Sequence, residues 1–270
     1  MHRHRLLVAV PLLVVALAPI GEAQAAGLLS HRAVYSLTRA HSSQAMDVTG
    51  VKGRLEMTFE AACDGWRMEQ FIGFQLYHPQ GPGLEHLAQL SGWESVDGAD
   101  YRFNTLSYVD REVQEKLGGV AHVEAHGKAG ETTYSTPEPI TRSLPPGTIF
   151  PARHLAELVA AAARGERHLA RTVFDGSTMD SPYEIVAFIG EPREPSAQAP
   201  AGLEGLRSWP LRLAYFRVAT KQPSPEFEMS AVLYENGVAG DMVYDYGDLA
   251  IDVKLAELER LPATECRQKD

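Results

Sequence analysis

The segment VKGRLEMTFEAACDGWRMEQ, residues 51–70, decides the fold class of this chain. From Val51 to Cys63 every second residue is apolar or small, and the intervening positions are mostly charged or polar, with Ala62 as the exception. This period of two is typical of a β-strand with one buried face. The alternation therefore predicts a strand that ends at the Asp64–Gly65 turn, with Cys63 in its inward phase.

Strand-like patterns continue along most of the chain. Asn236–Gly237, between two alternating runs, is the strongest hairpin signal. We also expect turns at the Gly/Pro-rich loop 80–83 and at Asp175–Gly176, and an exposed loop at 191–200. The spacing predicts a long antiparallel meander, with further strand-like segments at 31–40, 67–79, 101–111, 119–127, 169–177, 181–191, 209–219 and 225–262.

One segment, TIFPARHLAELVAAAARGERH (148–168), predicts a helix. Pro151 lies near its start and Gly165 just past its end, which is the usual asymmetry of helix termini. An apolar stripe follows the helical period; its members are Leu155, Leu158, Val159 and Ala162. The sequence therefore predicts a mostly β protein whose curled sheet surrounds one central α-helix.

The first residues have the three-part layout of a secretory signal peptide. Arg3 and Arg5 precede the apolar run 6–17, and a small-residue cleavage site follows at 23–25. A short membrane anchor is the alternative, but the run is short for a membrane span. We therefore expect residues 1–25 to be removed, and residues 26–270 to form a single exported domain in the periplasm with no stable membrane insertion.

Charge restricts the kinds of partner. The full chain carries a net charge of −10, and removal of Arg3, Arg5 and Glu22 with the leader would bring it near −11. An acidic protein repels nucleic acids and anionic lipid surfaces. The sequence therefore predicts no nucleic-acid partner.

The chain has two cysteines, Cys63 and Cys266. An oxidising compartment allows them to form one internal disulfide, and two free thiols or an intermolecular link are the alternatives. The bond would close a loop of about 200 residues, for which the chain-entropy model gives a stabilisation of about 5 kcal/mol. A redox motif is not indicated, because there is no CxxC.

Few residues indicate chemistry. His122, Glu124 and His126 alternate on one face of a predicted strand and resemble a metal-binding triad in composition. A solvated polar face explains the same pattern, and same-face neighbours are about 7 Å apart, which is wide for a compact metal site. Residues 78–86 can be interpreted as a ligand-facing loop, but a simple strand connection accounts for their Gly and Pro content. We therefore expect no metal site.

Motifs of catalysis and cofactor binding are missing from the sequence: it has no GxSxG, HExxH, GxGxxG or P-loop pattern. Met242, Tyr244 and Tyr246 form a stripe on one strand face, for which core packing is favoured over a ligand groove. The sequence therefore predicts a protein without enzymatic activity or cofactor, and leaves its ligand-binding residues unknown.

Several segments, in collinear order, resemble the EipB family of periplasmic cell-envelope integrity proteins of alphaproteobacteria. No single segment is specific to this family, whereas the combination of the segments with two cysteines at these positions is fairly specific. The segments are HRAVYSLTRA (31–40), GRLEMTFEAACDGW (53–66), LPPGTIFPARHLAELVAAAARGE (144–166), FDGS (174–177), YEIVAFIG (183–190), ENGVAGDMVYDYGDLAIDVKLAELERLP (235–262) and the terminal Cys266.

The resemblance implies a broken β-spiral with a helix held inside it, and a disulfide between Cys63 and Cys266. It also implies a role in maintaining the envelope barrier against stress, without an established enzyme activity. The spiral of this family is similar in outline to the clasping sheets of periplasmic lipoprotein carriers, and a peptide-binding role has been suggested for it.

Three functions follow for testing. The first is a non-enzymatic envelope factor that binds a peptide or protein segment on its curved sheet, with edge-strand pairing as one way to capture it. The second is a periplasmic carrier of a lipid or acylated protein, which requires an apolar cavity between sheet and helix. The third is a hydrolase with a site assembled from scattered residues, for which perturbed carboxylates or histidines in a cleft would be needed. A monomer is expected.

Overall fold

The computed structural model describes residues 27–44, 47–124, 128–220, 223–264 and 266. The expected leader, 1–25, lies outside these residues. The described chain contains one helix and fourteen strands: β1 (His31–Arg39), β2 (Gly50–Ala62), β3 (Gly65–His78), β4 (Gly81–Ser95), β5 (Asp100–Val109), β6 (Glu112–Val123), β7 (Gly130–Thr136), β8 (Ile140–Leu144), α1 (Pro151–Ala163), β9 (His168–Val173), β10 (Tyr183–Ile189), β11 (Ser208–Arg217), β12 (Phe227–Tyr234), β13 (Ala239–Asp245) and β14 (Ala250–Arg260).

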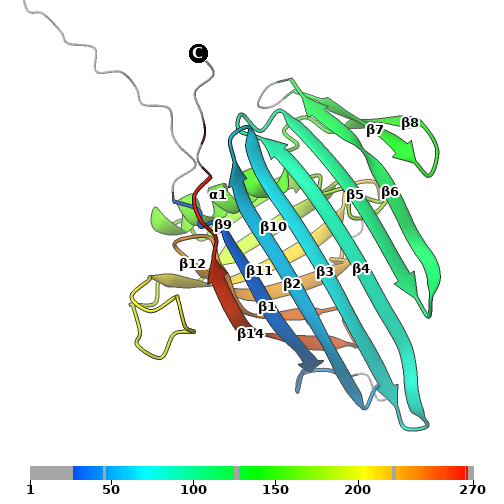
Figure 1. Ribbon diagram of the computed structural model, residues 1–270, viewed down its shortest axis with the longest axis vertical. Helices are drawn as coiled ribbons and strands as arrows, with labels where there is room; N and C mark the ends of the chain where they lie inside the picture. The colour runs from blue at the N-terminus through cyan, green and yellow to red at the C-terminus, as the bar shows by residue number, and fades with distance from the viewer. Residues whose placement is uncertain (1–26, 45–46, 125–127, 221–222, 265, 267–270) are drawn as a thin grey trace, which may run out of the picture.

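The strands form one antiparallel sheet in the order β8-β7-β6-β5-β4-β3-β2-β1-β14-β13-β12-β11-β10-β9. Consecutive strands are neighbours except β8 and β9, which α1 separates, and β1 pairs with β14 in the middle, so the two ends of the meander meet. The sheet curls back on itself with α1 on its concave side, and it stays open because β8 and β9 are its two edges (Figure 1). This confirms the prediction of a curled, mostly β fold around one helix.

The helix begins and ends where the sequence predicts. Pro151 is its first residue, and Gly165 follows its end with a φ of 77°, a left-handed conformation that favours glycine. Leu158, Val159 and Ala162 of the predicted stripe are buried, and Leu155 packs against the same cluster. Within the described residues, no helix is long and apolar enough to cross a membrane.

The N-terminus of α1 takes its cap from the sheet. Phe150 occupies the N-cap position and offers no side-chain hydrogen bond. The carboxylate of Glu94 on β4 instead accepts the backbone N–H of Ala152 at 2.7 Å and that of Arg153 at 3.0 Å. Glu94 is only 2% exposed, and this burial raises its pKa to about 7. One buried carboxyl group therefore joins the helix to the sheet.

Two connections differ from the sequence-based prediction. Residues 80–83 are not a loop: the turn consists of Pro79 and Gln80, and β4, which was not predicted, starts at Gly81. The pattern 81–95 hides this strand because glycine and proline begin it, and because glycines and histidine interrupt its apolar phase.

Asp175–Gly176 does not make a tight hairpin turn either. β9 and β10 do pair, but the connection between them, 174–182, reaches across to β5. The hydroxyl of Thr105 donates to the Gly176 carbonyl oxygen at 2.8 Å, and a methyl group at Gly176 would lie 2.4 Å from the Phe103 ring. The glycine is needed for this close approach as well as for its positive φ of 65°. The Asn236–Gly237 turn is confirmed, with the Gly237 N–H donating to the Tyr234 carbonyl oxygen at 2.8 Å.

The interior is filled in three places on the concave side. One cluster joins the helix to β9–β12, and a second lies along the seam of β1, β2 and β14. The third, here called the packed aromatic cluster, consists of Tyr101, Phe103, Tyr134, Phe150 and Phe174. Because Phe150 and Phe174 come from segments flanking α1 and β9, this cluster joins the first half of the sheet to the second.

Candidate functional site

A second aromatic group on the inner face is less enclosed. Strand register places Tyr215 of β11 opposite Phe227 of β12, and Met229 opposite Tyr244 of β13. These positions share the strand phase of buried core residues such as Leu213 and Ala231 and therefore face the concave side. We call the following group the inner tyrosine cluster: Tyr183, Tyr215, Phe227, Tyr244 and Tyr246.

Ring contacts connect most of this cluster. Tyr215 and Phe227 stack with ring centroids 4.1 Å apart and an interplanar angle of 16°. Phe227 lies 5.8 Å from Tyr246, and Tyr183 lies 6.3 Å from Tyr215. The two longer distances are ordinary spacings for attractive aromatic pairs, and the Tyr215–Phe227 stack is closer. The rings therefore form a connected apolar surface across β10–β13.

The cluster is enclosed by protein but not covered. Tyr246 is 50% exposed, and Tyr215, Phe227 and Tyr244 are partly buried. Burial nevertheless raises the pKa of Tyr215, Tyr244 and Tyr246 above the usual range of a phenol. The combination of partial exposure with strong desolvation is what a concave surface produces, because protein surrounds a group that solvent still reaches.

The hydroxyl groups of Tyr215, Tyr244 and Tyr246 make no hydrogen bond to any described residue, whereas that of Tyr183 pairs with Thr178 at 3.1 Å. After burial, the electrostatic influence of Tyr246 and of Tyr215 raises the pKa of Tyr244. All three stay protonated at neutral pH, and each can donate and accept a hydrogen bond. The arrangement offers three polar groups on an apolar aromatic surface.

The opposite wall, from β3 and β4, carries a matching aromatic pair. Phe74 and His86 are cross-strand partners and stack at 5.0 Å. Burial lowers the pKa of His86, and its Nδ1 is buried without a hydrogen-bond partner in the described structure. Leu76 and Leu90 lie in the same strand phase and are partly buried. The imidazole is therefore neutral at pH 7, and this wall is also mainly apolar.

Charged groups lie beside the inner tyrosine cluster. Arg217, next to Tyr183 in the register, pairs with Glu226 and, at 3.0 Å, with Asp180. On β6, burial and then the nearby Asp180 carboxylate raise the pKa of Glu115. The apolar surface thus has a polar border, which is the usual composition of a ligand-binding surface.

Cys63 and Cys266 form a disulfide with their Cα atoms 5.4 Å apart, and no described cysteine is free. The bond joins the residue after β2 to the tail after β14. The tail also lies against the sheet through hydrogen bonds from the Leu261 N–H to the Ser30 carbonyl oxygen and from the Thr264 hydroxyl to the Ala61 carbonyl oxygen.

The other candidate residues are not brought together. His122 is exposed and its Nδ1 lies 2.7 Å from Asp100, Glu124 lies 3.7 Å from Lys128, and His126 is outside the described residues. The described part of the chain contains no group of three or more His, Cys, Asp or Glu suited to a metal ion. Residues 78–86 comprise the end of β3, the turn 79–80 and the start of β4 rather than a ligand-facing loop.

Core packing explains only part of the stripe on β13. Met242 is buried, as favoured, but Tyr246 is half exposed, so that interpretation was wrong for Tyr246. Sequence reasoning also missed Tyr183, Tyr215 and Phe227. Their aromatic character was visible in the alternating runs, but only strand register shows that they meet.

These observations define a class first: an open, curled antiparallel sheet protein, cross-linked by a disulfide, with a partly uncovered aromatic inner face. The model of the EipB-like family matches residues 22–262, and the chain belongs to this family. It is 28% identical over 244 residues to the cell envelope integrity protein EipB of Brucella abortus strain 2308, covering 88% of this chain and 86% of that protein.

A solved structure is similar throughout. It is described as a beta-barrel-like protein of a domain of unknown function from Brucella abortus. The TM-score is 0.78 at 28% sequence identity, and the match covers 87% of this chain and 99% of the other. The family is named for envelope integrity and not for a reaction.

Proposed function

We propose that this protein supports the integrity of the cell envelope as a non-enzymatic, monomeric periplasmic factor that holds an extended peptide or protein segment on its concave sheet. The envelope role is supported by the name of the Brucella relative. The binding role is supported by one observation above all: three tyrosine hydroxyls without partners stand on a partly exposed aromatic surface.

Such a surface suits a peptide. Aromatic rings pack against apolar side chains or prolines at low conformational-entropy cost, and phenol hydroxyls pair with the amide groups of a peptide backbone. A buried peptide must have its amides satisfied, and Tyr215, Tyr244 and Tyr246 can do so without breaking an internal bond.

The sheet edge offers a second contact for the same segment. β6 pairs with β7 only from Gly118 onward, so the described part of its first half, Glu112–Leu117, has a strand on one side only. Glu112 and Lys116 are exposed there, which is how natural sheets limit unspecific edge pairing. A partner strand that complements these charges could still add to this edge.

The alternative, a carrier of a lipid or acylated protein, is less well supported. The contact between α1 and the sheet is filled by buried side chains such as Leu158, Val159 and Trp209, where the carrier hypothesis needs a cavity. The partly buried Leu76, Leu90 and Met229 on the inner face are the feature in its favour.

Native mass spectrometry of the protein purified from the periplasm of its host tests these functions. Recovered peptides support the proposal, whereas lipid that is recovered without any peptide counts against it. The peptides would then be titrated against the double variant Tyr215→Phe/Tyr244→Phe. Loss of two neutral hydrogen bonds should cost about 2 kcal/mol, which is roughly thirtyfold in Kd.

Tyr108→Phe is the matched control. Tyr108 is also a partly buried tyrosine, but it lies on the convex face of the sheet, in β5. It should bind peptide like the wild type. In cells, the double variant should restore less detergent resistance than the control in a strain that lacks the gene. Equal peptide affinity of all three proteins would refute the role of the inner tyrosine cluster.

A further inference from the structure

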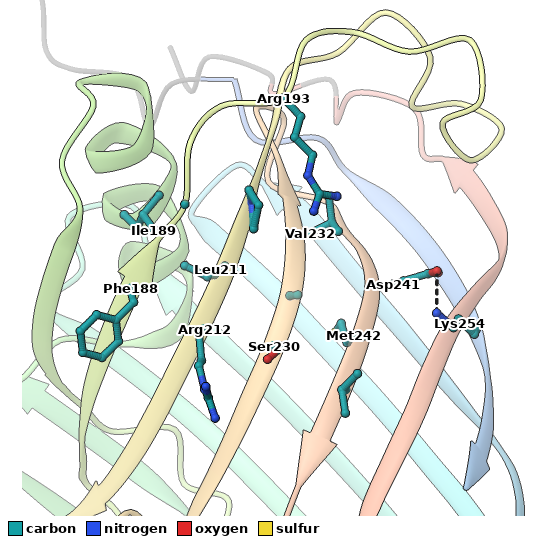
Figure 2. Close-up of a pocket in the computed structure, with 14 residues that line it drawn as sticks. Phe188, Ile189, Arg193, Leu211, Arg212, Ser230, Val232, Asp241, Met242 and Lys254 are labelled. Atoms are coloured by element: carbon teal, nitrogen blue, oxygen red, sulfur yellow. Dashed lines mark hydrogen bonds and ion pairs between the residues drawn. The ribbon is translucent and has the colours of Figure 1, made fainter. Parts of the chain in front are cut away.

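The outer face of the same half of the sheet contains a groove that the inner site does not use. It has a volume of about 480 Å³ and crosses β10–β14 (Figure 2). A neighbouring hollow of about 340 Å³ lies under the loop 193–200 and shares Arg193, Val232 and Asp241 with it. The two hollows therefore form one continuous depression on the convex side.

Residue size explains the depression. Pro210 of β11 and Ser230 and Val232 of β12 are short residues in the outward strand phase, and Gly190, which follows β10, lies beside Pro210. A methyl group at Gly190 would lie 3.0 to 3.1 Å from the Pro210 ring, so the glycine keeps the floor low. Longer side chains stand around this floor, among them Phe188, Arg193, Arg212, Asp241 and Lys254.

The charges of the rim are not all neutralised. Lys254 pairs with Asp241 at 3.1 Å, and Arg212 pairs with Glu228 at 2.7 Å. Arg193 makes no ion pair with any carboxylate of the described residues. Its backbone is fixed by the bridge to Ser208, with a hydrogen bond of 2.7 Å, and its side chain runs from the loop toward Val232 (Figure 2). In a chain of net charge −10, this leaves one guanidinium group available for an anion.

We propose that this groove binds an anionic amphiphile. Its carboxylate or phosphate pairs with Arg193, and its apolar body lies over Pro210, Val232 and Val243. The positive charge of Arg193 favours a ligand with an anionic head group. The apolar floor favours an apolar tail, which the ligand needs because an exposed arginine alone binds an anion weakly.

The same surface disfavours a peptide. The backbone groups of β10–β14 are used in the sheet, so the amides of a peptide lying across its face would lose water without finding partners. An acyl chain has no such groups. The groove therefore differs in ligand chemistry from the inner tyrosine cluster, and it does not depend on the function proposed for that cluster.

Isothermal titration calorimetry below the micellar concentration tests the assignment. The probes are decanoate and lysophosphatidylglycerol, which have an anionic head, decyl maltoside, which has a neutral head, and acetate, which has no tail. At least one of the two anionic amphiphiles should bind about tenfold more tightly than decyl maltoside, because only an anionic head group pairs with Arg193. Decanoate alone would identify fatty acids as the source of the head group, and lysophosphatidylglycerol alone would identify phospholipids.

Variants locate the site. Arg193→Glu should weaken anionic amphiphiles by about tenfold or more and leave decyl maltoside unchanged. Ser230→Phe should fill the hollow and weaken all amphiphiles; if it fails to fold, Arg193→Glu decides alone. The control variant Arg67→Glu makes the same charge change at an exposed residue of β3, outside the groove. It should bind all amphiphiles like the wild type.

Four results would overturn the proposal. Two are equal affinity for neutral and anionic amphiphiles and unchanged binding by Arg193→Glu. The third is loss of amphiphile binding in the Tyr215→Phe/Tyr244→Phe variant, which would place the ligand on the inner face. The fourth is binding of peptides but not of amphiphiles at this groove.

Discussion

Two aromatic groups on the same concave face differ in what covers them. In the packed aromatic cluster, Phe103, Phe150 and Phe174 are fully buried, and the Tyr101 hydroxyl donates to the Asp175 carbonyl oxygen at 3.2 Å. In the inner tyrosine cluster only Tyr183 is buried, the other four rings are partly or half exposed, and three hydroxyls have no partner in the described structure. The residue types are alike, yet only the first group is closed.

The two clusters differ because other segments of the chain cover only one of them. The segment before α1 brings Phe150 into the packed aromatic cluster, and the connection 174–182 brings Phe174 and two backbone carbonyls. No described element is placed over Tyr244 and Tyr246 in this way. Core aromatics become a candidate binding surface where the chain supplies no lid.

The largest expected effect comes from removing one ring from each cluster. Phe174→Ala should lower the free energy of unfolding by about 3–5 kcal/mol, because it leaves a cavity in a closed core. Phe227→Ala should cost roughly half of that or less, since solvent already reaches its ring. Urea denaturation of both variants measures the contrast, and equal losses would mean that the two clusters are equally packed.

The disulfide should affect both clusters alike. Cys63→Ser and Cys266→Ser should each lower stability by about 2–4 kcal/mol under oxidising conditions, because the unfolded chain loses its cross-link. Added to Phe174→Ala or Phe227→Ala, either change should leave the difference between those two variants intact. Single cysteine variants that melt like the wild type would show that the bond does not hold the sheet.

Glu94, which lies opposite Tyr101 in the β4–β5 register, adds a pH test of the packed region. Its pKa is about 7 in the folded state against 4.5 in the reference state, so the folded protein holds the proton more tightly. The contribution of Glu94 to the free energy of unfolding is therefore fully present below pH 4.5 and is lost as the pH rises toward 7. The loss between pH 4.5 and pH 6 should be about 2 kcal/mol. Denaturation of wild type and Glu94→Gln across this range measures it, because the variant should lack this slope.

His154 supplies the opposite sign as a control. Burial lowers its pKa to about 4, so the unfolded chain binds the proton more readily. Its contribution to stability is present above pH 6.5 and is lost as the pH falls from 6.5 toward 4. The difference between wild type and His154→Leu should rise with pH, whereas the difference between wild type and Glu94→Gln should fall.

The smallest effect sharpens the comparison at single hydroxyl groups. Tyr101→Phe should cost about 1 kcal/mol, because it removes a hydrogen bond in a closed site. Tyr244→Phe should change stability by less than about 0.5 kcal/mol, since no internal partner is lost. Thermal denaturation monitored by circular dichroism is sufficient, and a larger loss for Tyr244→Phe would indicate a partner for its hydroxyl in solution.

Much of the fold could be predicted because its signals are local. Alternation over 51–63, the Asn236–Gly237 turn, and Pro151 with Gly165 each depend on neighbours in the chain. β4 was missed because its glycines, proline and histidine weaken the alternation. Glu94 was missed because it caps a helix some 58 residues away in sequence, and a capping residue outside its own helix has no local signature.

The candidate sites were not predictable in the same way. Tyr215 and Phe227 appeared only as residues of separate strands, and Gly190, Pro210 and Val232 as turn or strand residues without special meaning. The aromatic surface and the convex groove both arise from register between strands, together with what the loops cover. The local pattern of a single sequence carries no record of either.

By itself, the sequence determined that the chain forms amphipathic strands with one helix, because burial of alternate apolar residues is encoded in short periods. It also supplied two cysteines that an oxidising compartment allows to pair. Only the tertiary structure decided which aromatic residues are buried and which stay open, and which arginine has no carboxylate partner among the described residues. These outcomes depend on contacts between residues far apart in the chain. Such contacts contribute to the free energy of folding but leave no pattern among neighbouring residues of the sequence.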